Sequence, residues 1–352
     1  MGMFIIAEAG VNHNGDPALA LELIDAAARA GADAVKFQTF EPEALATGAA
    51  GKAEYQKVTT GGGESQLDML RRLVLPKECY PALQERCRSR GIRFLSTPFD
   101  LGSLRFLVDE VGIDLLKLSS GAVVHGPLLL AAARTGLPII LSTGMSTMGE
   151  IEGALAVLAF GVTQPVGNPS QDVLASRDLA PLAGRVTLLH CTTEYPAPLD
   201  QVNLRAMDGL AAHFGLPVGY SDHTQGITVT VAAAARGAMV VEKHFTLDRA
   251  LPGPDHKASL EPDELAAMVG AIREVEQALG VAEKAPTPAE LQVAKVARAS
   301  LVAARPIAAG TVLTEADLAV KRPGTGLSPL LYWHMLGRVA GHGYRTDELN
   351  DP

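Results

Sequence analysis

The chain has 352 residues, of which 47% are hydrophobic and 20% are charged, and its formal net charge is −9 at pH 7. This composition predicts a folded chain with room for one large domain and a small one. The acidic balance excludes a general binder of nucleic acid or of anionic membranes, because there is no basic excess to neutralise phosphates. Any anionic ligand must therefore be met locally, by lysine, arginine or backbone N–H groups.

Short apolar runs alternate with amphipathic helical stretches from Phe4 to about Leu279. Eight runs are typical of β-strands, at residues 4–10, 34–40, 92–99, 114–121, 137–145, 186–193, 216–224 and 238–245. Helices are predicted between them, for example at 17–32, 76–91 and 149–161, each with glycine at or near its end. Eight β-α units of this length predict a (β/α)8 TIM barrel in the α/β class, with a doubly wound open sheet as the alternative.

Two stretches depart from this repeat. Residues 41–66, which include "TTGGGES", are too long and glycine-rich for an ordinary connection and predict a lid or rim loop. After a predicted helix at 262–279, residues 281–297 contain "EKAPTPAE" and predict a linker. The short β runs and turns that follow predict a small β-rich domain at 298–352, so that the barrel domain spans 1–280.

Three cysteines, Cys79, Cys87 and Cys191, form neither a C-x-x-C pair nor a disulfide framework, which favours a reducing compartment. Cys191 follows His190, so a thiol nucleophile is conceivable. A small buried residue is the better interpretation, because no base-and-orienter pattern surrounds it. The N-terminal apolar run is too short for a signal peptide, and no run is long enough to span a membrane. We therefore expect a cytoplasmic protein.

Nearly every predicted strand is apolar in its first half and polar at its carboxyl end. The polar ends include Glu8, Lys36 with Gln38, Lys117 with Ser119 and Ser120, Ser142, His190 through Tyr195, Ser221 with His223, and Glu242 with His244. In a (β/α)8 barrel all the carboxyl ends converge on one face, where active sites lie. The agreement among the strands therefore predicts a catalytic pocket at that face.

The last strand ends in Glu242, Lys243 and His244. Strand alternation places Glu242 and His244 on one face and turns Lys243 to the other, where we expect an ion pair behind the strand. His223 ends the preceding strand, and neighbouring parallel strands lie about 4.8 Å apart. The two imidazoles could therefore share one divalent ion, with positions left open for water and for an oxygen-rich ligand.

Lys36 and Lys117 would be costly inside a barrel mouth unless they met anions. Three interpretations remain open: a phosphate or carboxylate clamp, a Schiff-base lysine, and buried ion pairs to Glu8 or Glu242. Three serines share the predicted mouth: Ser120, Ser142 and Ser221. These hydroxyls favour the clamp, because a Schiff base needs no ring of hydroxyls. Glu8 could also serve as an acid or base there.

A family resemblance rests on motifs in a fixed order: "AEAGVNHNG", "KFQTF", "STPFD", "STGMST", "LLHCTTEYPAP", "GYSDHT", "EKHFTLD" and "GPDHKASLEP". They resemble the sialic acid synthase family, and "RASLVAARPIAAGTVLTEADLAVKRPGTG" is similar to its antifreeze-like (SAF) domain. The resemblance implies an enzyme that condenses phosphoenolpyruvate with an N-acetylmannosamine-type sugar. The motifs look more like the legionaminic acid branch, whose sugar is a 6-deoxy-2,4-diacetamido mannose.

The resemblance also implies roles for individual residues. A divalent metal, Mn²⁺ or Mg²⁺, would be held by His223 and His244. Phosphoenolpyruvate would be contacted by Lys117, Ser120, Ser142 and Ser221, with Gln38 nearby as a further substrate-binding residue. The sugar and the catalytic steps would involve Glu8, Lys36, Thr193, Tyr195, Glu242 and Asp255. Arg322, in "KRPG", would reach the barrel of the other subunit in a domain-swapped homodimer.

The implied reaction begins when C3 of phosphoenolpyruvate attacks the aldehyde of the open-chain sugar, polarised by the metal. Water then adds at C2 and phosphate departs. One position departs from the family, since Ala122 stands where members usually carry an acidic residue, with His125 further on. This departure motivates a third hypothesis, a catalytically inactive carbohydrate-binding relative, beside the synthase and a Schiff-base aldolase or lyase.

Overall fold

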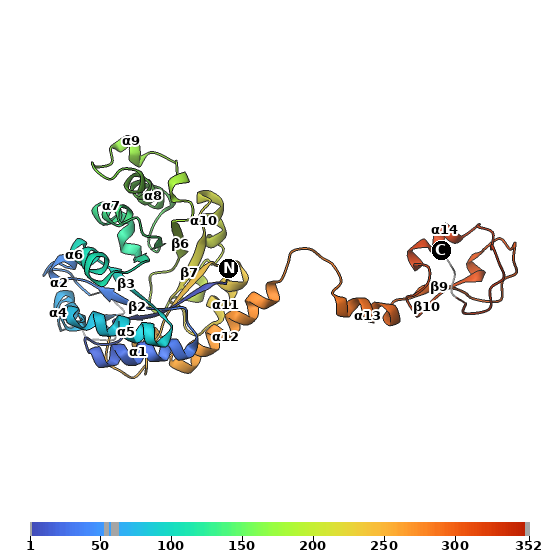
Figure 1. Cartoon of the computed structure of the whole chain (residues 1–352), viewed down its shortest axis with the longest axis horizontal. Coiled ribbons are helices and arrows are strands. Elements are labelled where there is room, and N and C mark those ends of the chain that lie inside the picture. The colour runs from blue at the N-terminus through green and yellow to red at the C-terminus, as the bar shows by residue number, and fades with distance from the viewer. Residues whose placement is uncertain (1, 53–55, 58–62, 349–352) are drawn as a thin grey trace. The chain divides into compact units, whose positions relative to one another are not determined.

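The computed structural model describes residues 2–52, 56–57 and 63–348 (Figure 1). The chain divides into two compact units, Met1–Gly280 and Val281–Pro352. The described part of the chain contains no helix that is long and apolar enough to cross a membrane.

The first unit contains all eight strands expected from the sequence. They are β1 (Phe4–Gly10), β2 (Ala34–Thr39), β3 (Arg93–Pro98), β4 (Leu116–Leu118), β5 (Ile139–Ser142), β6 (Val186–His190), β7 (Val218–Asp222) and β8 (Val240–His244). The ladder pairings between them are parallel, in the order β3-β2-β1-β8-β7-β6-β5-β4. Because β3 also contacts β4, the sheet comes round on itself. This order confirms the TIM barrel and excludes the doubly wound open sheet.

Helices cover the outside of the barrel (Figure 1). The longer ones are α1 (Pro17–Ala30), α5 (Tyr80–Arg90), α7 (Gly126–Arg134), α8 (Met148–Thr163), α10 (Ala206–Phe214), α11 (Thr228–Ala235) and α12 (Pro262–Leu279). Shorter ones are α2 (Pro42–Leu45), α4 (Gln66–Leu73), α6 (Leu101–Arg105) and α9 (Gln171–Leu174). Local signals fix their ends: the Asp16 side chain caps α1, and Gly31 ends it with a left-handed φ of 82°.

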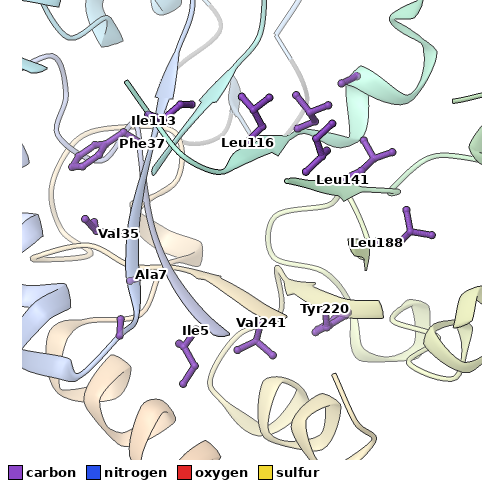
Figure 2. Close-up of a cluster of buried hydrophobic side chains, with 14 of the residues drawn as sticks. Ile5, Ala7, Val35, Phe37, Ile113, Leu116, Leu141, Leu188, Tyr220 and Val241 are labelled. Carbon is purple, nitrogen blue, oxygen red and sulfur yellow. The ribbon is translucent and has the colours of Figure 1, made fainter. Parts of the chain in front are cut away.

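The side chains of the strands alternate between two apolar layers. Those that point outward pack against the helices in the main hydrophobic core, shown in Figure 2 from Ile5 on β1 to Val241 on β8. Those that point inward form a smaller cluster of Ile6, Ala34, Leu95, Leu115, Ile140, Leu189 and Val240. We call this cluster the apolar floor. It closes the interior below the polar carboxyl ends of the strands, so the barrel has a pocket at one end rather than a channel.

The second unit contains α13 (Pro288–Ala297), the antiparallel strands β9 (Ser300–Ala303) and β10 (Leu318–Lys321), and α14 (Tyr332–Met335). Its core is small and consists of Ala303, Ile307, Leu313, Leu318 and Ala340. The second half of the predicted linker at 281–297 is helical, because α13 occupies it. Thr287 and Glu290 form a capping box there, and Pro288 takes the first helical position, where proline favours a helix start.

Gly219 on β7 offers a test of how tightly the barrel closes. A β-carbon at this position would collide with the carbonyl oxygen of Val240 on the neighbouring strand β8. We therefore expect Gly219→Ala to force the strands apart and to lower the free energy of unfolding by about 3 kcal/mol in urea denaturation. Gly209→Ala on α10 is the matched control, since nothing lies within 4 Å of its added carbon; it should be neutral or stabilise by up to about 1 kcal/mol. Equal stability of the two variants would contradict this packing.

Candidate active site

A pocket of about 440 Å³ lies at the carboxyl ends of the strands. All of the predicted site residues except Arg322 line it: Glu8, Lys36, Gln38, Lys117, Ser120, Ser142, Thr193, Tyr195, Ser221, His223, Glu242, His244 and Asp255. Strand register explains the convergence, because Glu8 on β1 pairs with Lys36 on β2 and with His244 on β8. The expected convergence of the strand ends is therefore present in the fold.

Arg322 lies in the second unit, directly after β10, and its side chain is exposed. The loop that carries it is anchored by Ser300, whose hydroxyl donates to the Pro323 carbonyl at 2.7 Å and accepts from the Gly326 N–H at 2.8 Å. The base of the loop is thus fixed while Arg322 projects from it.

Four buried side chains, which we call the charge array, meet above the apolar floor: Glu8, Lys36, Lys117 and Glu242. Lys36 Nζ lies 2.8 Å from Glu8 Oε2 and 3.6 Å from Glu242 Oε2. Lys117 Nζ lies 3.1 Å from Glu242 Oε1, and all four side chains are at most 5% exposed. Ion pairing was one of the three interpretations of the lysines. It explains how two ammonium groups stay charged in a buried site.

The charge array shifts the pKa of its members in different directions. Burial raises the pKa of Glu8, although Lys36 opposes the shift. Burial alone would also raise the pKa of Glu242, but Lys117 and Lys36 outweigh it and hold that pKa far below its usual range. Burial lowers the pKa of Lys117, whereas for Lys36 the attraction of Glu242 and Glu8 outweighs burial and raises the pKa. Glu242 is therefore ionised at neutral pH, and Glu8 is the carboxyl that takes up a proton more readily.

His223 and His244 both line the pocket, with ring centroids 5.6 Å apart. His223 Nδ1 lies 2.6 Å from the carbonyl oxygen of Thr192, so Nδ1 carries the proton and Nε2 is an acceptor. That Nε2 lies 3.1 Å from the Tyr195 hydroxyl. Burial lowers the pKa of His223 to about 4 and that of His244 well below its usual value. Both rings are therefore neutral at pH 7, the form that binds metal ions.

His223 and His244 suit a divalent ion that a substrate also binds. Among the residues that the structure describes, no group of three or more His, Cys, Asp or Glu side chains is arranged to hold a metal. The imidazoles nevertheless suit a site that a substrate completes, because the tautomer of His223 is fixed by Thr192 and His244 Nδ1 is buried with no hydrogen-bond partner in the described structure. The metal site stays a prediction.

Lys243 faces away from the pocket, as strand alternation predicted. Its side chain is fully buried behind the barrel wall, where Nζ lies 3.0 Å from Asp222 Oδ2 and donates to the Thr224 carbonyl. Asp222 also accepts from the Thr224 N–H and from the Thr230 hydroxyl. Because Asp222 and Lys243 are register partners on β7 and β8, their ion pair supports the strand ends that carry the two histidines.

Asp255 enters the pocket from the loop after β8 and is 7% exposed. Its backbone is held in place by Ser259, whose hydroxyl donates to the Asp255 carbonyl at 2.7 Å. Asn12 Nδ2 in turn donates to Ser259 Oγ at 3.0 Å. Burial, with a further contribution from the charge of Glu8, raises the pKa of Asp255 to about 7. This carboxyl can therefore exchange a proton at neutral pH.

A small polar corner forms around Gly144. Its N–H donates to Ser120 Oγ at 3.0 Å, and a β-carbon at Gly144 would collide with the side chains of Ser120, Cys191 and Thr193. Ser142 Oγ is buried nearby in the pocket wall, without a hydrogen-bond partner among the described residues. Burial raises the pKa of the Cys191 thiol, which agrees with the interpretation of Cys191 as a buried residue rather than a nucleophile. The corner offers hydroxyl donors to an anion.

A group of apolar residues that line the pocket was not predicted from the sequence. An apolar wall consists of Val11, Phe40, Met69, Leu73 and Phe99. Val11, Phe40 and Phe99 follow β1, β2 and β3, whereas Met69 and Leu73 lie on α4.

The helix α4 begins at Gln66, where the predicted rim segment ends. A sequence signal for it was present, because Ser65 stands three residues before Asp68 and an amphipathic run follows. In the structure Ser65 Oγ accepts from the Asp68 N–H at 3.1 Å. The rim segment itself begins with α2, and the part of the lid prediction that falls on 53–55 and 58–62 lies outside the described residues.

Ala122 and His125 also line the pocket. His125 caps α7, where its Nδ1 accepts from the Leu128 N–H at 3.3 Å. In the neutral ring Nε2 is therefore the donor. The pocket thus has an imidazole near the position where the family resemblance led us to expect a carboxylate.

Comparison with known proteins gives consistent matches over the whole chain. The model of the NeuB family matches residues 23–284, and that of the SAF domain matches residues 298–340. The N,N'-diacetyllegionaminic acid synthase of Campylobacter jejuni is 46% identical over 345 residues, 98% of each chain. Its counterpart from Legionella pneumophila is 45% identical over 329 residues, 94% of this chain and 88% of that protein.

A solved structure is also similar. The N-acetylneuraminic acid (sialic acid) synthetase of Leptospira borgpetersenii, in complex with citrate, aligns with a TM-score of 0.68 and 34% identity. The alignment covers 83% of this chain and 90% of that one.

Asp255→Asn tests the raised pKa of Asp255 through its effect on stability. The folded chain keeps this proton up to about pH 7, whereas the unfolded chain releases it near about pH 4. The stability contributed by the proton is complete below the unfolded pKa and is lost as the pH rises through the folded one. We therefore expect the variant to gain stability relative to the original chain between about pH 4 and pH 7, with no further gain above that window. Urea unfolding across this range measures the difference; a difference that does not vary with pH would contradict the shift.

Proposed function

The chain belongs to the NeuB family, and on this premise we propose that it condenses phosphoenolpyruvate with an N-acetylated amino sugar to give a sialic acid-type nine-carbon acid and phosphate. The relatives at 45–46% identity are named N,N'-diacetyllegionaminic acid synthases. Their names favour 2,4-diacetamido-2,4,6-trideoxymannose over N-acetylmannosamine as the sugar. The observation that carries the proposal is the charge array beside two neutral imidazoles in a single pocket.

Phosphoenolpyruvate brings a phosphate and a carboxylate to the pocket. Lys117 and Lys36 supply the positive charge to bind them, through charge-assisted hydrogen bonds. The Gly144 corner supports this assignment, because the hydroxyls of Ser120 and Ser142 both line the pocket. Gln38, whose Nε2 donates to Glu8 Oε1 at 3.1 Å, would help to orient the carboxylate of the substrate.

The reaction forms one C–C bond and breaks one C–O bond. C3 of phosphoenolpyruvate attacks the aldehyde carbon of the open-chain sugar, and C2 becomes positively charged. The ionised Glu242 stabilises that charge. The aldehyde oxygen takes up a proton and becomes a hydroxyl. Water adds to C2 and gives up one proton; phosphate then leaves with the electron pair of its C2–O bond as the new hydroxyl loses its proton and becomes the C2 ketone. Asp255, whose pKa is about 7, is suited to take the proton that the water releases.

A divalent ion, Mn²⁺ or Mg²⁺, would be held by His223 and His244. When bound it would act as a Lewis acid on the aldehyde oxygen of the sugar. Support comes from the neutral form of both rings and from the buried, unpaired Nδ1 of His244. Tyr195, now hydrogen-bonded to His223 Nε2, would turn its hydroxyl to the substrate when that nitrogen is engaged. Thr193 adds a further hydroxyl for the sugar.

We also propose that the enzyme acts in the cytoplasm as a homodimer in which Arg322 completes the site of the other subunit. The support is the match to the SAF domain and the anchored loop that leaves Arg322 exposed. A cationic side chain at the pocket entrance would add positive charge where the substrates are anionic.

The two alternative functions are less well supported. A Schiff-base lysine must be free and neutral before it reacts, whereas Lys36 and Lys117 lie in ion pairs with Glu8 and Glu242. An inactive carbohydrate-binding relative is suggested only by Ala122. All the predicted site residues of the barrel line the pocket, which favours an active enzyme.

The proposal predicts that phosphate is released from phosphoenolpyruvate only when an amino sugar and a divalent ion are both present. The assay offers 2,4-diacetamido-2,4,6-trideoxymannose and N-acetylmannosamine separately, with Mn²⁺ and with EDTA. Activity that survives EDTA, together with a borohydride-trapped substrate adduct, would instead establish the Schiff-base enzyme. Sugar binding without phosphate release would establish the inactive relative.

The variant His244→Ala tests the metal-ligand assignment in the same assay. It should lose metal-dependent turnover and bind Mn²⁺ more weakly in a titration, while its thermal midpoint stays close to that of the original chain. Unchanged turnover and unchanged Mn²⁺ binding would refute His244 as a ligand.

A further inference from the structure

The pocket is lined by two chemically different sets of side chains. One set is the charge array, the two histidines and the serines, and the other is the apolar wall of Val11, Phe40, Met69, Leu73 and Phe99. None of the five wall side chains carries a group that pairs well with a hydroxyl. The proposed chemistry needs the first set and leaves the second without a role.

The side chains of the apolar wall are packed against one another. Phe40 and Phe99 meet edge to face with ring centroids 6.2 Å apart. Val11, Phe40, Met69 and Leu73 are all buried and form one cluster, against which Phe99 packs. Side chains packed against one another in this way cannot turn aside to make room for polar groups without leaving a void.

We propose that the apolar wall selects the sugar by its methyl groups, namely the C6 methyl of a 6-deoxy sugar and the methyl of an acetamido group. This inference rests on the proposed function and concerns the methyl groups of the sugar rather than its reacting aldehyde. A methyl group against the wall leaves water and gains contact. A hydroxyl in the same place loses its water partners and finds no replacement.

An acetamido group also carries an amide, and the same side of the pocket offers a partner for it. Gln66, in the first turn of α4, lines the pocket beside the apolar wall. Its side-chain amide can both donate and accept. An amide next to an apolar surface is the arrangement that recognises an acetamido group, with its polar and methyl parts side by side.

The size of the expected selectivity follows from the chemistry of such surfaces. A hydrophobic site rejects a substrate that merely adds a hydroxyl by roughly a hundredfold at most. We therefore expect kcat/KM for 2,4-diacetamido-2,4,6-trideoxymannose to exceed that for N-acetylmannosamine by about ten- to a hundredfold. A sugar that lacks only the 6-hydroxyl, 2-acetamido-2,6-dideoxymannose, should fall between them.

The test places a polar group in the apolar wall. Met69→Gln should lower the ratio of the two kcat/KM values by about tenfold, mainly through loss of the deoxy sugar, and should leave the KM for phosphoenolpyruvate unchanged. Leu67→Gln is the matched control, because it makes a similar change on the same helix at a residue that does not line the pocket. Its ratio should equal that of the original chain. Phe99→Tyr adds a single hydroxyl at a half-buried position, and it decides the question if Met69→Gln fails to fold.

The outcomes separate the two proposals. Turnover with a ratio that neither Met69→Gln nor Phe99→Tyr changes would overturn the role of the apolar wall and leave the proposed function intact. A preference of the original chain for N-acetylmannosamine would do the same. No turnover of any of the sugars would overturn the proposed function, and the wall assignment with it.

Discussion

Lys36 and Lys117 stay charged inside the barrel only because Glu8 and Glu242 lie within 2.8–3.6 Å of them. Four buried charges are stable only if each has a partner, since an unpaired one costs several kcal/mol. The partners come from β1, β2, β4 and β8, so the ion pairs form only when the barrel closes. The two ammonium groups give an acidic protein local hydrogen-bond donors for an anionic substrate.

The alternation of side chains along the strands keeps structural and chemical roles apart. On β8, Val241 packs into the outer hydrophobic core and Glu242 joins the charge array. Lys243 pairs with Asp222 on the outer side of the barrel sheet. A shift of one residue in register would turn each of them to the wrong face. The buried Asp222–Lys243 pair, which opposes such a shift, therefore also supports the position of His244 in the pocket.

The strands and most of the site could be predicted from the sequence, because each depends on local patterns. A run such as "VVEKH" shows both the apolar strand and its polar end, and parallel strands bring all such ends together. The partners within the charge array could not be predicted, since Lys117 and Glu242 are 125 positions apart and three interpretations of the lysines were open. The apolar wall could not be predicted, because its residues come from α4 and from the ends of three strands, and only the fold brings them together. The helix α13 was not predicted, because prolines on both sides of Thr287 are typical of a linker, although Pro288 takes the first position of a helix.

We propose, as the central claim, that the ionised Glu242 stabilises the positive charge that develops at C2 of phosphoenolpyruvate. The most direct measurement compares the Kd of phosphoenolpyruvate, by calorimetry, and kcat between the original chain and Glu242→Gln. The variant removes the charge that would stabilise C2, so we expect its kcat to fall by about a hundredfold; because Lys117 loses its ion-pair partner, phosphoenolpyruvate should bind no more tightly than to the original chain. An unchanged kcat, or a loss of turnover that is explained by weaker binding of phosphoenolpyruvate alone, would contradict the account.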